Sequence, residues 1–494
     1  MDLPLGERQA WLRPAITGNQ TPDGFPNAGT TAWVQTRPGL PYFVTETGSP
    51  WTPVGQNDAI DWVELRDLFR RRDLPGVEAH LRWLRASGVN CLRLMLEYAH
   101  RRHRYIERPV GRFVPDMVRL WDDLFRLCEE IGLKILLTPF DTFWTWLQWK
   151  HHPYNVLNGG PLRRPSEFLL SPATRAAIKA RLGFAVERWG GSHALFAWDL
   201  WNEIHPAQAG GSADCFGEFI QDLSHNVRRL ETRLYGRAHP QTVSLFGPEL
   251  WWRPEMELRE PIFRHPDLDF ASIHLYHQGT IDAPDNTVDP AISTGRIVRE
   301  AIAEIRDGRP FLDTEHGPIH TFKDKRRSLP EAFDDEYFRH MQWAHLASGG
   351  AGGGMRWPNR KPHVLTRGMR EAQRALSDFL PLVDWTSFRR KNLNREIRAL
   401  SSDIAVFGCA DERQAVIWLL RRNTIGADGL LRKDVAPTST TIRIPGLAAG
   451  TYAATGWNTT DGAMAWNQEV STEAALMLNV PPFAADIAIA VRPV

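Results

Sequence analysis

The chain of 494 residues has almost no excess of charge of either sign, which limits its partners. Its 59 Lys and Arg stand against 58 Asp and Glu, so the formal net charge is +1. Proteins that bind nucleic acid usually carry a strongly basic face, and we therefore predict no nucleic-acid partner. Charged residues make up 24% and hydrophobic residues 43% of the chain, as in an ordinary globular protein that can bury a large core.

Cysteine is scarce and shows no functional spacing. The four cysteines are Cys91, Cys128, Cys215 and Cys409. No two of them have the spacing of a metal site or a redox motif, so a reduced compartment is the simplest interpretation. Cys91 lies in an apolar run and Cys128 on the apolar side of a helical pattern. Both are expected to act as small core side chains.

Long apolar runs are also missing. No stretch of about 18 apolar residues occurs, so no membrane span and no membrane partner are expected. The first eight residues lack the apolar segment of a signal peptide. These observations predict a cytoplasmic protein, and they leave its oligomeric state open.

Tryptophan, in contrast, is abundant. The chain has 20 Trp, and many lie near the ends of predicted strands: Trp144, Trp146, Trp149, Trp198, Trp201, Trp251, Trp252 and Trp357. Flat amphipathic rings pack well on the C–H faces of sugars, although roughly half of these residues are expected to be core fillers. We expect Trp144 and Trp146, which follow the third predicted strand, to bind substrate.

From about residue 40 to 380, short apolar runs alternate with helical patterns. This order predicts a parallel sheet with crossover helices. The predicted strands are Tyr42–Val44 continuing toward Val54, Val89–Leu96, Lys134–Thr138, Leu195–Leu200, Thr242–Phe246, Asp269–Leu275, Pro310–Asp313 and Gly352–Trp357. Eight strand–helix units indicate an α/β fold with a closed (β/α)₈ TIM barrel. A doubly wound open sheet is the alternative, but no Gly-rich phosphate loop follows the first strand.

Two helices carry clear end signals. One has an apolar stripe at spacings of three and four, formed by Met117, Trp121, Leu124, Cys128 and Ile131. Gly132 is expected to end this helix. Ser171 followed by Pro172 has the form of an N-cap with proline at the first helical position, and this helix is expected to run to about Trp189.

After about residue 385 the pattern changes to short alternating segments. They are Ile404–Phe407, Ala415–Leu420, Thr440–Ile444, Thr451–Thr455, Ala475–Leu478 and Asp486–Val491. Regular short strands separated by turn residues predict an antiparallel β-sandwich. We therefore divide the chain into an N-terminal extension (1–38), a catalytic barrel (39–384) and a C-terminal β-sandwich domain (385–494). The sandwich either binds carbohydrate or braces the barrel. Its aromatic residues Trp418, Tyr452, Trp457 and Trp466 are expected to be exposed, but they are too few to decide between these roles.

Two segments point to a reaction. Phe196–Glu203 and Phe311–Glu315 each form an apolar strand that ends in a carboxylate, 315 − 203 = 112 residues apart. If both strands belong to one barrel, their carboxyl ends can converge on one pocket. Paired carboxylates at such a place are the groups that cleave glycosidic bonds.

Residues near these carboxylates support the same chemistry. Asn202 precedes Glu203, and its amide could donate to a sugar hydroxyl. A nucleophile must stay ionised, so we expect a fixed cation to lower the pKa of Glu315. Arg93 interrupts the apolar run from Cys91 to Met95, and a buried arginine requires an anionic partner. Arg93 is therefore the candidate cation.

Several motifs in residues 40–380 resemble those of known enzymes. They are Asn90-Cys91-Leu92-Arg93, Trp198-Asp199-Leu200-Trp201-Asn202-Glu203, His274-Leu275-Tyr276, Asp313-Thr314-Glu315 and Met355-Arg356-Trp357. The chain resembles the clan A glycoside hydrolases, and most of all the cellulase- and mannanase-like barrels of family five. The Asn-Glu pair on the fourth strand together with a Glu on the seventh is the most specific part of this resemblance.

The resemblance implies a role for each matching residue. Glu203 would be the general acid/base and Glu315 the nucleophile. Arg93 and Tyr276 would hold Glu315 in place, and Asn202 would bind the 2-hydroxyl of the sugar under attack.

Two further residues take substrate-binding roles from the resemblance. His274 would position Glu203 or the substrate, and Trp357 would form the floor of the −1 subsite. The segment from Phe140 to Trp146 departs from the family, because it lacks a pattern that ties it to one substrate.

The expected activity is hydrolysis of a β-linked oligosaccharide or glycoside with retention of configuration and without a cofactor. A transglycosylase with the same site is one alternative, and a non-catalytic carbohydrate-binding barrel is another. A metal-dependent hydrolase is a third. His316 and His320 have the spacing of a metal-binding helix, but Gly317 and Pro318 between them break that geometry, so no metal site is expected.

Overall fold

A computed structural model describes residues 32–97, 104–276, 284–317, 329–358 and 363–494. Its main sheet is parallel, and each strand pairs with the next along the chain. The strands are β4 (Gly55–Asp58), β5 (Cys91–Met95), β6 (Lys134–Thr138), β7 (Leu195–Asp199), β8 (Gln241–Thr242), β9 (Ser244–Phe246), β10 (Ala271–Leu275), β11 (Phe311–His316) and β12 (Met355–Arg356).

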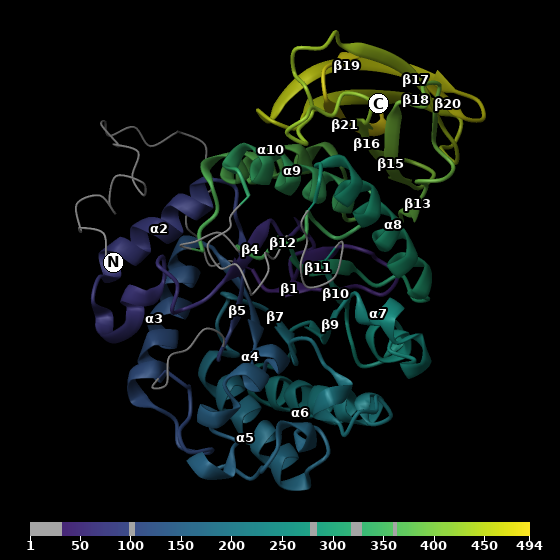
Figure 1. Ribbon diagram of the computed structural model, residues 1–494. Coiled ribbons are helices and arrows are strands. Elements are labelled where there is room, and N and C mark those ends of the chain that lie inside the picture. Colours follow the sequence, from purple (N-terminus) through teal and green to yellow (C-terminus); the bar gives the residue numbers. More distant parts are fainter. Residues whose placement is uncertain (1–31, 98–103, 277–283, 318–328, 359–362) are drawn as a thin grey trace.

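This sheet closes into a barrel. Strands β8 and β9 are two parts of one strand, separated only by Val243, and β12 pairs with β4 to complete the ring. The predicted (β/α)₈ TIM barrel is therefore confirmed, and the strands lie at the centre of Figure 1 with helices around them.

The helices of the barrel are mostly long. They are α2 (Leu74–Ala86), α3 (Pro115–Ile131), α5 (Pro172–Trp189), α6 (Phe216–Tyr235), α8 (Val288–Glu304), α9 (Glu331–Ala347) and α10 (Arg367–Phe379), with short helices α4 (Thr142–Leu147) and α7 (Glu249–Trp252) after β6 and β9. Short 3₁₀ segments lie at η1 (Arg66–Arg71), η2 (Trp149–His151), η3 (Val156–Asn158), η4 (Pro165–Glu167), η5 (Pro206–Gln208), η6 (Pro254–Met256) and η8 (Leu380–Leu382), and η7 (Glu260–Arg264) is a short π-helix.

Both predicted helix ends are confirmed. Gly132 follows α3 with a left-handed φ of 82°, a conformation that glycine adopts at low cost. The side chain of Ser171 accepts a hydrogen bond from the Thr174 backbone N–H at the start of α5. Local capping chemistry thus fixes where these helices meet the strands on either side.

The prediction for the first barrel strand is wrong. Phe43 belongs to a small antiparallel sheet of β1 (Val34–Gln35), β2 (Phe43–Thr45) and β3 (Pro50–Trp51), and the barrel begins only at β4. The ring of Phe43 packs edge-on against Phe196 at 4.9 Å and Phe270 at 5.3 Å. Those rings stand at the start of β7 and just before β10, so the small sheet covers the amino-terminal end of the barrel. Burial against that end explains an apolar run that resembles a barrel strand.

The C-terminal domain consists of two antiparallel sheets, as predicted. One has the order β13 (Lys391–Asn392), β15 (Ile404–Ala410), β16 (Ala415–Arg421), β21 (Asp486–Pro493), β18 (Gly450–Asn458) and β19 (Ala463–Thr472). The other contains β14 (Arg398–Ala399), β17 (Thr438–Ile444) and β20 (Leu476–Phe483). Ile417, Ile442 and Leu478 lie buried in the core of this domain. Strand β19 was not predicted, because it is mostly exposed and has no regular apolar alternation.

The sandwich packs on the barrel through aromatic side chains. Trp418 and Trp457 are buried in one apolar cluster with Trp343 of α9 and Phe379 of α10. The indole N–H of Trp457 donates to the Ala375 carbonyl at 3.0 Å. Trp418, Tyr452 and Trp457 were expected to be exposed, and that expectation is wrong. Trp418 and Trp457 lie against helices that cover the barrel, and Tyr452 is buried in the core of the sandwich.

A buried ion pair crosses the same contact. Arg339 of α9 pairs with Asp486 of β21 and donates to Thr459 at 2.7 Å. Burial has the largest single effect and raises the pKa of Asp486, but the Arg339 guanidinium, His340 and the hydrogen bonds from Thr459 and Trp418 together outweigh it, so the pKa lies below its usual value. In Figure 1 the sandwich lies beside α9 and α10 at one edge of the barrel. Among the described residues, no helix is both long and apolar enough to cross a bilayer.

Trp457→Ala tests whether the sandwich braces the barrel. Removing the buried indole should lower the free energy of unfolding by about 3 kcal/mol or more. Met464→Ala, a change at a residue that is 60% exposed, is the control and should stay within about 0.5 kcal/mol. Denaturant unfolding of both variants measures the difference, and equal stability would contradict a bracing role for this contact.

Candidate active site

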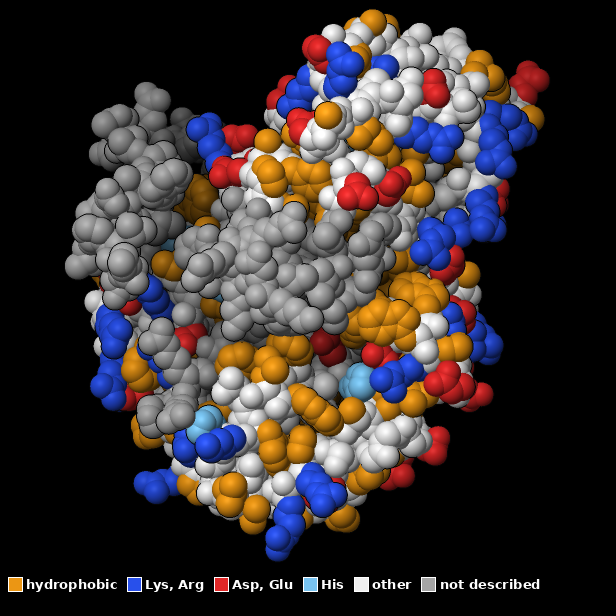
Figure 2. Space-filling model, viewed as in Figure 1, with side chains coloured by type: hydrophobic (Ala, Val, Ile, Leu, Met, Phe, Trp, Pro, Cys, Tyr) orange, Lys and Arg blue, Asp and Glu red, His pale blue; other side chains and the backbone are white. Residues whose placement is uncertain are grey.

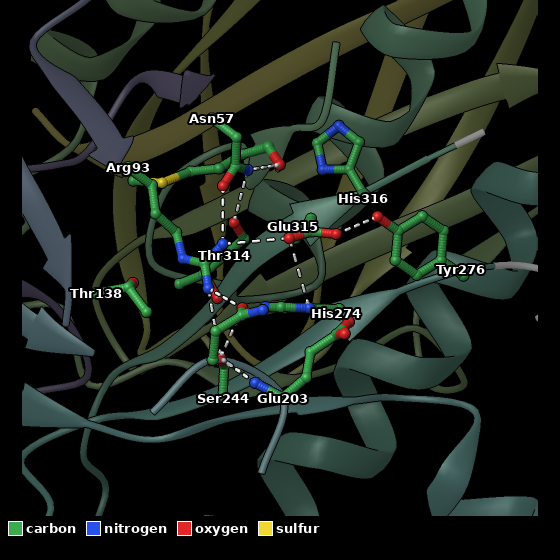
Figure 3. A network of polar contacts seen from close by, with 12 residues as sticks. Asn57, Arg93, Thr138, Glu203, Ser244, His274, Tyr276, Thr314, Glu315 and His316 are labelled. Atoms are coloured by element: carbon green, nitrogen blue, oxygen red, sulfur yellow. Dashed lines mark hydrogen bonds and ion pairs between the residues drawn. The ribbon is translucent and has the colours of Figure 1, made fainter. Parts of the chain in front are cut away.

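The structure brings two carboxylates together at one end of the barrel. Glu203 follows β7, and Glu315 lies near the carboxyl end of β11. Glu203, Glu315 and His274 each offer an atom that lies within 4.8 Å of the atoms offered by the other two. Figure 3 shows the three side chains directed toward one another.

Glu203 is held in an unusual backbone conformation. Its φ is 50°, in the left-handed region that residues other than glycine rarely adopt. Its N–H donates to the Ser244 hydroxyl at 3.2 Å, and the N–H of the preceding Asn202 donates to the Phe140 carbonyl at 2.8 Å. Such strain persists where surrounding contacts determine the geometry, and it is common at functional sites.

Arg93 occupies the interior of the barrel. Its side chain, which has no exposed surface, donates to Asp199 at 2.7 Å and to Glu315 at 3.2 Å. It also donates to Asn57 at 2.8 Å and forms a short contact with the side-chain oxygen of Asn202. One guanidinium therefore connects β4, β5, β7 and β11, and both of its nearest charges are negative.

Three side chains face the carboxylate of Glu315. The hydroxyl of Tyr276 donates to Oε1, and Arg93 donates to Oε2. His274 lies directly opposite Glu315 in the sheet, because the register between β10 and β11 shifts by one residue after Ile273. Its Nδ1 is 3.7 Å from Oε2. This carboxylate is fixed from several directions, and the side chain of Glu315 is only 8% exposed.

The pKa values of Glu203 and His274 move in opposite directions. Burial raises the pKa of Glu203 to about 7, although Arg93 and His205 act to lower it. Burial lowers the pKa of His274 to about 4. Nδ1 of His274 is 2.8 Å from Oε1 of Glu203. Near neutral pH this pair therefore combines a neutral imidazole with a carboxyl group that can hold a proton.

The expected direction of the pKa shift at Glu315 is wrong. The expected cation is present, and Arg93 does act to lower this pKa. Burial has the largest effect, however, and the nearby Glu203 adds to it, so the pKa of Glu315 lies above its ordinary value. A carboxylate inside a barrel loses more hydration than one guanidinium shared with Asp199 can replace.

The tryptophans predicted to bind substrate lie in different surroundings. Trp357 is 6% exposed and packs edge-on against Trp62 with ring centroids 5.1 Å apart. Trp144 and Trp146 are on α4, and Trp146 is 43% exposed. Figure 2 shows hydrophobic side chains at several places on this face of the molecule, among charged and other side chains. On the same rim, after β9, Trp252 of α7 is 56% exposed.

Sequence reasoning missed four polar residues around this centre. Asn57, Asp199 and Ser244 contact Arg93, and Asp141 contacts Asn202. A signal existed for Asp199, because it interrupts an apolar strand just as Arg93 does. Their strands, β7 and β5, are alternate strands of the barrel, and side chains from alternate strands share one interior layer.

Two groups of described residues are close enough to hold a cation. One is Glu203, His274 and Glu315, and the other is Asp58, Glu64 and His80. In the second group Arg370 acts electrostatically on Asp58 and Glu64, so a protein cation already faces those carboxylates. In the first group Arg93 pairs with Glu315.

Arg93→Ala should destabilise the protein strongly. Without the guanidinium, Asp199 and Glu315 would be buried charges without a cation, which costs about 3–5 kcal/mol. Arg367→Ala is a control of the same type, since that side chain is 89% exposed. Chemical unfolding followed by circular dichroism measures both, and a loss below about 1 kcal/mol for Arg93→Ala would contradict this account.

No family model matches the chain. The chain is 23% identical over 279 residues to a probable mannan endo-1,4-β-mannosidase F from Aspergillus oryzae, a match covering 55% of this chain and 56% of the relative. A protein of the same name from Aspergillus flavus is 25% identical over 206 residues, covering 41% of this chain and 42% of the relative. The chain thus spans about half of the length of the curated relatives it matches.

Solved structures match over more of the chain. A glycoside hydrolase has a TM-score of 0.59 at 12% identity and covers 94% of this chain and 97% of its own. A family 5 glycoside hydrolase from Bacteroides vulgatus has a TM-score of 0.55 at 12% identity, with 94% of each chain covered. A family 5 mannosidase from Rhizomucor miehei has a TM-score of 0.52 at 14% identity, and the match covers 71% of this chain and 98% of the mannosidase chain. The resemblance expected from the motifs is confirmed: the chain resembles the family 5 glycoside hydrolases of clan A and shares the fold of a TIM barrel with a C-terminal β-domain.

Proposed function

We propose that the protein is a retaining glycoside hydrolase that cleaves β-linked oligosaccharides or glycosides. The observation that carries this proposal is that one carboxylate oxygen of Glu203 lies within 4.8 Å of one carboxylate oxygen of Glu315, at the carboxyl ends of two barrel strands. Retaining enzymes hold their carboxyl groups ~5–5.5 Å apart, whereas inverting enzymes need ~6.5–9.5 Å to admit a water molecule. The separation favours retention.

The first step forms a covalent intermediate. An oxygen of Glu315 attacks the anomeric carbon, the glycosidic C–O bond breaks, and Glu203 gives its proton to the leaving oxygen. Glu203 suits the acid role because burial raises its pKa to about 7. Glu315 suits the nucleophile role because Arg93 and Tyr276 both donate to its carboxylate and favour the ionised form.

The second step releases the sugar. Glu203, now ionised, takes a proton from water, and the water oxygen attacks the anomeric carbon as the bond to Glu315 breaks. Both carboxyl groups return to their starting states, so no cofactor is consumed. Neutral His274 stays hydrogen-bonded to Glu203 and keeps it in place through both steps.

The remaining site residues would contact the sugar. Asn202 would bind its 2-hydroxyl, and Trp357 would lie under the −1 sugar. Trp144 and Trp146 would stack on neighbouring sugar units from α4. Because both curated relatives bear the name of a mannan endo-1,4-β-mannosidase, β-1,4-linked mannosides are the first substrates to test.

Three alternatives predict different products or sensitivities. A transglycosylase would transfer the sugar from Glu315 to a second sugar, and chromatography of the products would show it. A carbohydrate-binding barrel would retain its sugar without cleavage, although it would have little need for the arginine shared between Asp199 and Glu315. A metal-dependent hydrolase would lose activity in excess chelator, whereas the proposed enzyme should retain it.

Alanine variants of the two carboxylates test the mechanism directly. Glu203→Ala should lower kcat/KM by about 10²–10⁴-fold, and Glu315→Ala should abolish measurable turnover, because no nucleophile remains. Azide should rescue Glu315→Ala and give a glycosyl azide of inverted configuration. The exposed Glu260→Ala serves as the control. Wild-type turnover by Glu315→Ala would contradict the proposed role.

The pH profile of kcat/KM gives an independent check. Activity should fall above about pH 7, because Glu203 loses the proton that it must donate. It should also fall on the acid side as Glu315 takes up a proton, at a pH above the usual range for glutamate because its pKa is raised. With an aryl glycoside whose leaving group needs no protonation, Glu203→Gln should abolish the alkaline decline. Persistence of that decline would show that another group titrates.

A further inference from the structure

Asp141 and Asn202 lie side by side just beyond the ends of two neighbouring strands. Asp141 follows β6, Asn202 follows β7, and the two residues form an isolated parallel bridge. The Thr142 N–H donates to the Asn202 carbonyl at 3.1 Å, and the Asn202 N–H donates to the Phe140 carbonyl at 2.8 Å. The backbone therefore extends the sheet pairing to the residue directly before Glu203. Both residues are 2% exposed.

The side chain of Asn202 is held at both ends of its amide. Its nitrogen donates to Oδ1 of Asp141, and its oxygen accepts a short hydrogen bond from Arg93. A flipped amide would place its NH₂ group against a guanidinium and its oxygen against a carboxylate, and both contacts would be repulsive. The charges on Asp141 and Arg93 thus select one orientation of the amide. The second N–H of the amide is not used in the contacts with these two residues.

Asp141 uses both carboxylate oxygens. Oδ2 accepts the backbone N–H of Trp144 at the start of α4, while Oδ1 accepts from Asn202. Burial raises the pKa of Asp141 to about 7, although both donors act to lower it. Only a carboxylate offers two acceptors in this geometry, because an amide in its place would turn an NH₂ group toward one of the two donors.

We propose that Asp141 is a positioning residue that orients the amide of Asn202, so that the remaining N–H of the amide faces the 2-hydroxyl of the sugar under attack. The inference rests on the proposed function. In this proposal Asn202, after β7, recognises the 2-hydroxyl, and Asp141, after β6, holds its amide nitrogen. Arg93 holds the amide oxygen. Asp141 itself does not contact the reacting atoms.

The test compares an aryl β-mannoside with its 2-deoxy analogue. The ratio of their kcat/KM values reports the contact to the 2-hydroxyl, whereas a general loss of structure lowers both values together. Asp141→Asn and Asp141→Ala should each lower this ratio at least about tenfold, as should Asn202→Ala. In the double variant Asp141→Ala/Asn202→Ala the ratio should fall no further than in Asn202→Ala alone.

Thr145→Val is the matched control. Thr145 is buried in α4 and its hydroxyl donates to the Asp141 carbonyl, but its side chain forms no hydrogen bond with Asn202. Its ratio should equal that of the wild type. If Asp141→Ala fails to fold, the ratio measured for the nearly isosteric Asp141→Asn tests the role of Asp141.

The outcomes separate the two proposals. A wild-type ratio in Asp141→Asn, together with a lowered ratio in Asn202→Ala, would overturn the role of Asp141 and leave the proposed hydrolase intact. Wild-type protein that cleaves no glycoside would overturn both. If Thr145→Val lowers the ratio as much as the Asp141 variants do, the inference would also be overturned. The effect would then come from a general disturbance of α4 and not from the contact between Asp141 and Asn202.

Discussion

The site depends on one buried cation. Arg93 has no exposed surface, and the guanidinium must therefore find its partners inside the barrel. Asp199 and Glu315 supply the charges, and Asn57 and Asn202 supply neutral acceptors. A carboxylate and an amide from distant parts of the chain thus meet because both satisfy the same arginine. The guanidinium also gives each partner a direction, since its N–H groups radiate in a fixed plane.

Exclusion of water makes the burial of this cation unfavourable, and it also shifts the pKa values of the titratable groups around it. Burial raises the pKa of Glu203 to about 7 and lowers that of His274 to about 4, so each favours its neutral form. Glu315 has a raised pKa as well, but it alone of the two glutamates accepts from Arg93 and Tyr276. Environment, not residue type, distinguishes one glutamate from the other.

Support for this centre comes from both sides of the barrel. The small sheet with Phe43 covers the amino-terminal end and leaves the carboxyl ends of the strands to carry the polar residues. The sandwich packs on α9 and α10, and the barrel side of that contact is a continuous apolar cluster that includes Trp343. Neither element contributes one of the side chains that surround the two glutamates.

Much of this architecture could be predicted from local pattern. Apolar runs identified most strands, and the capping residues Gly132 and Ser171 identified ends of two barrel helices, because periodicity and backbone chemistry act over a few residues. The first strand was misplaced, since burial at the end of a barrel and burial within its wall leave the same apolar signature. Of the polar partners of the site, Asp199 interrupts an apolar strand and could have been noticed, whereas Asp141 had no such local signal. Which carboxylate meets which donor depends on strand order, register and the shift between β10 and β11, and these arise only when distant segments pack together.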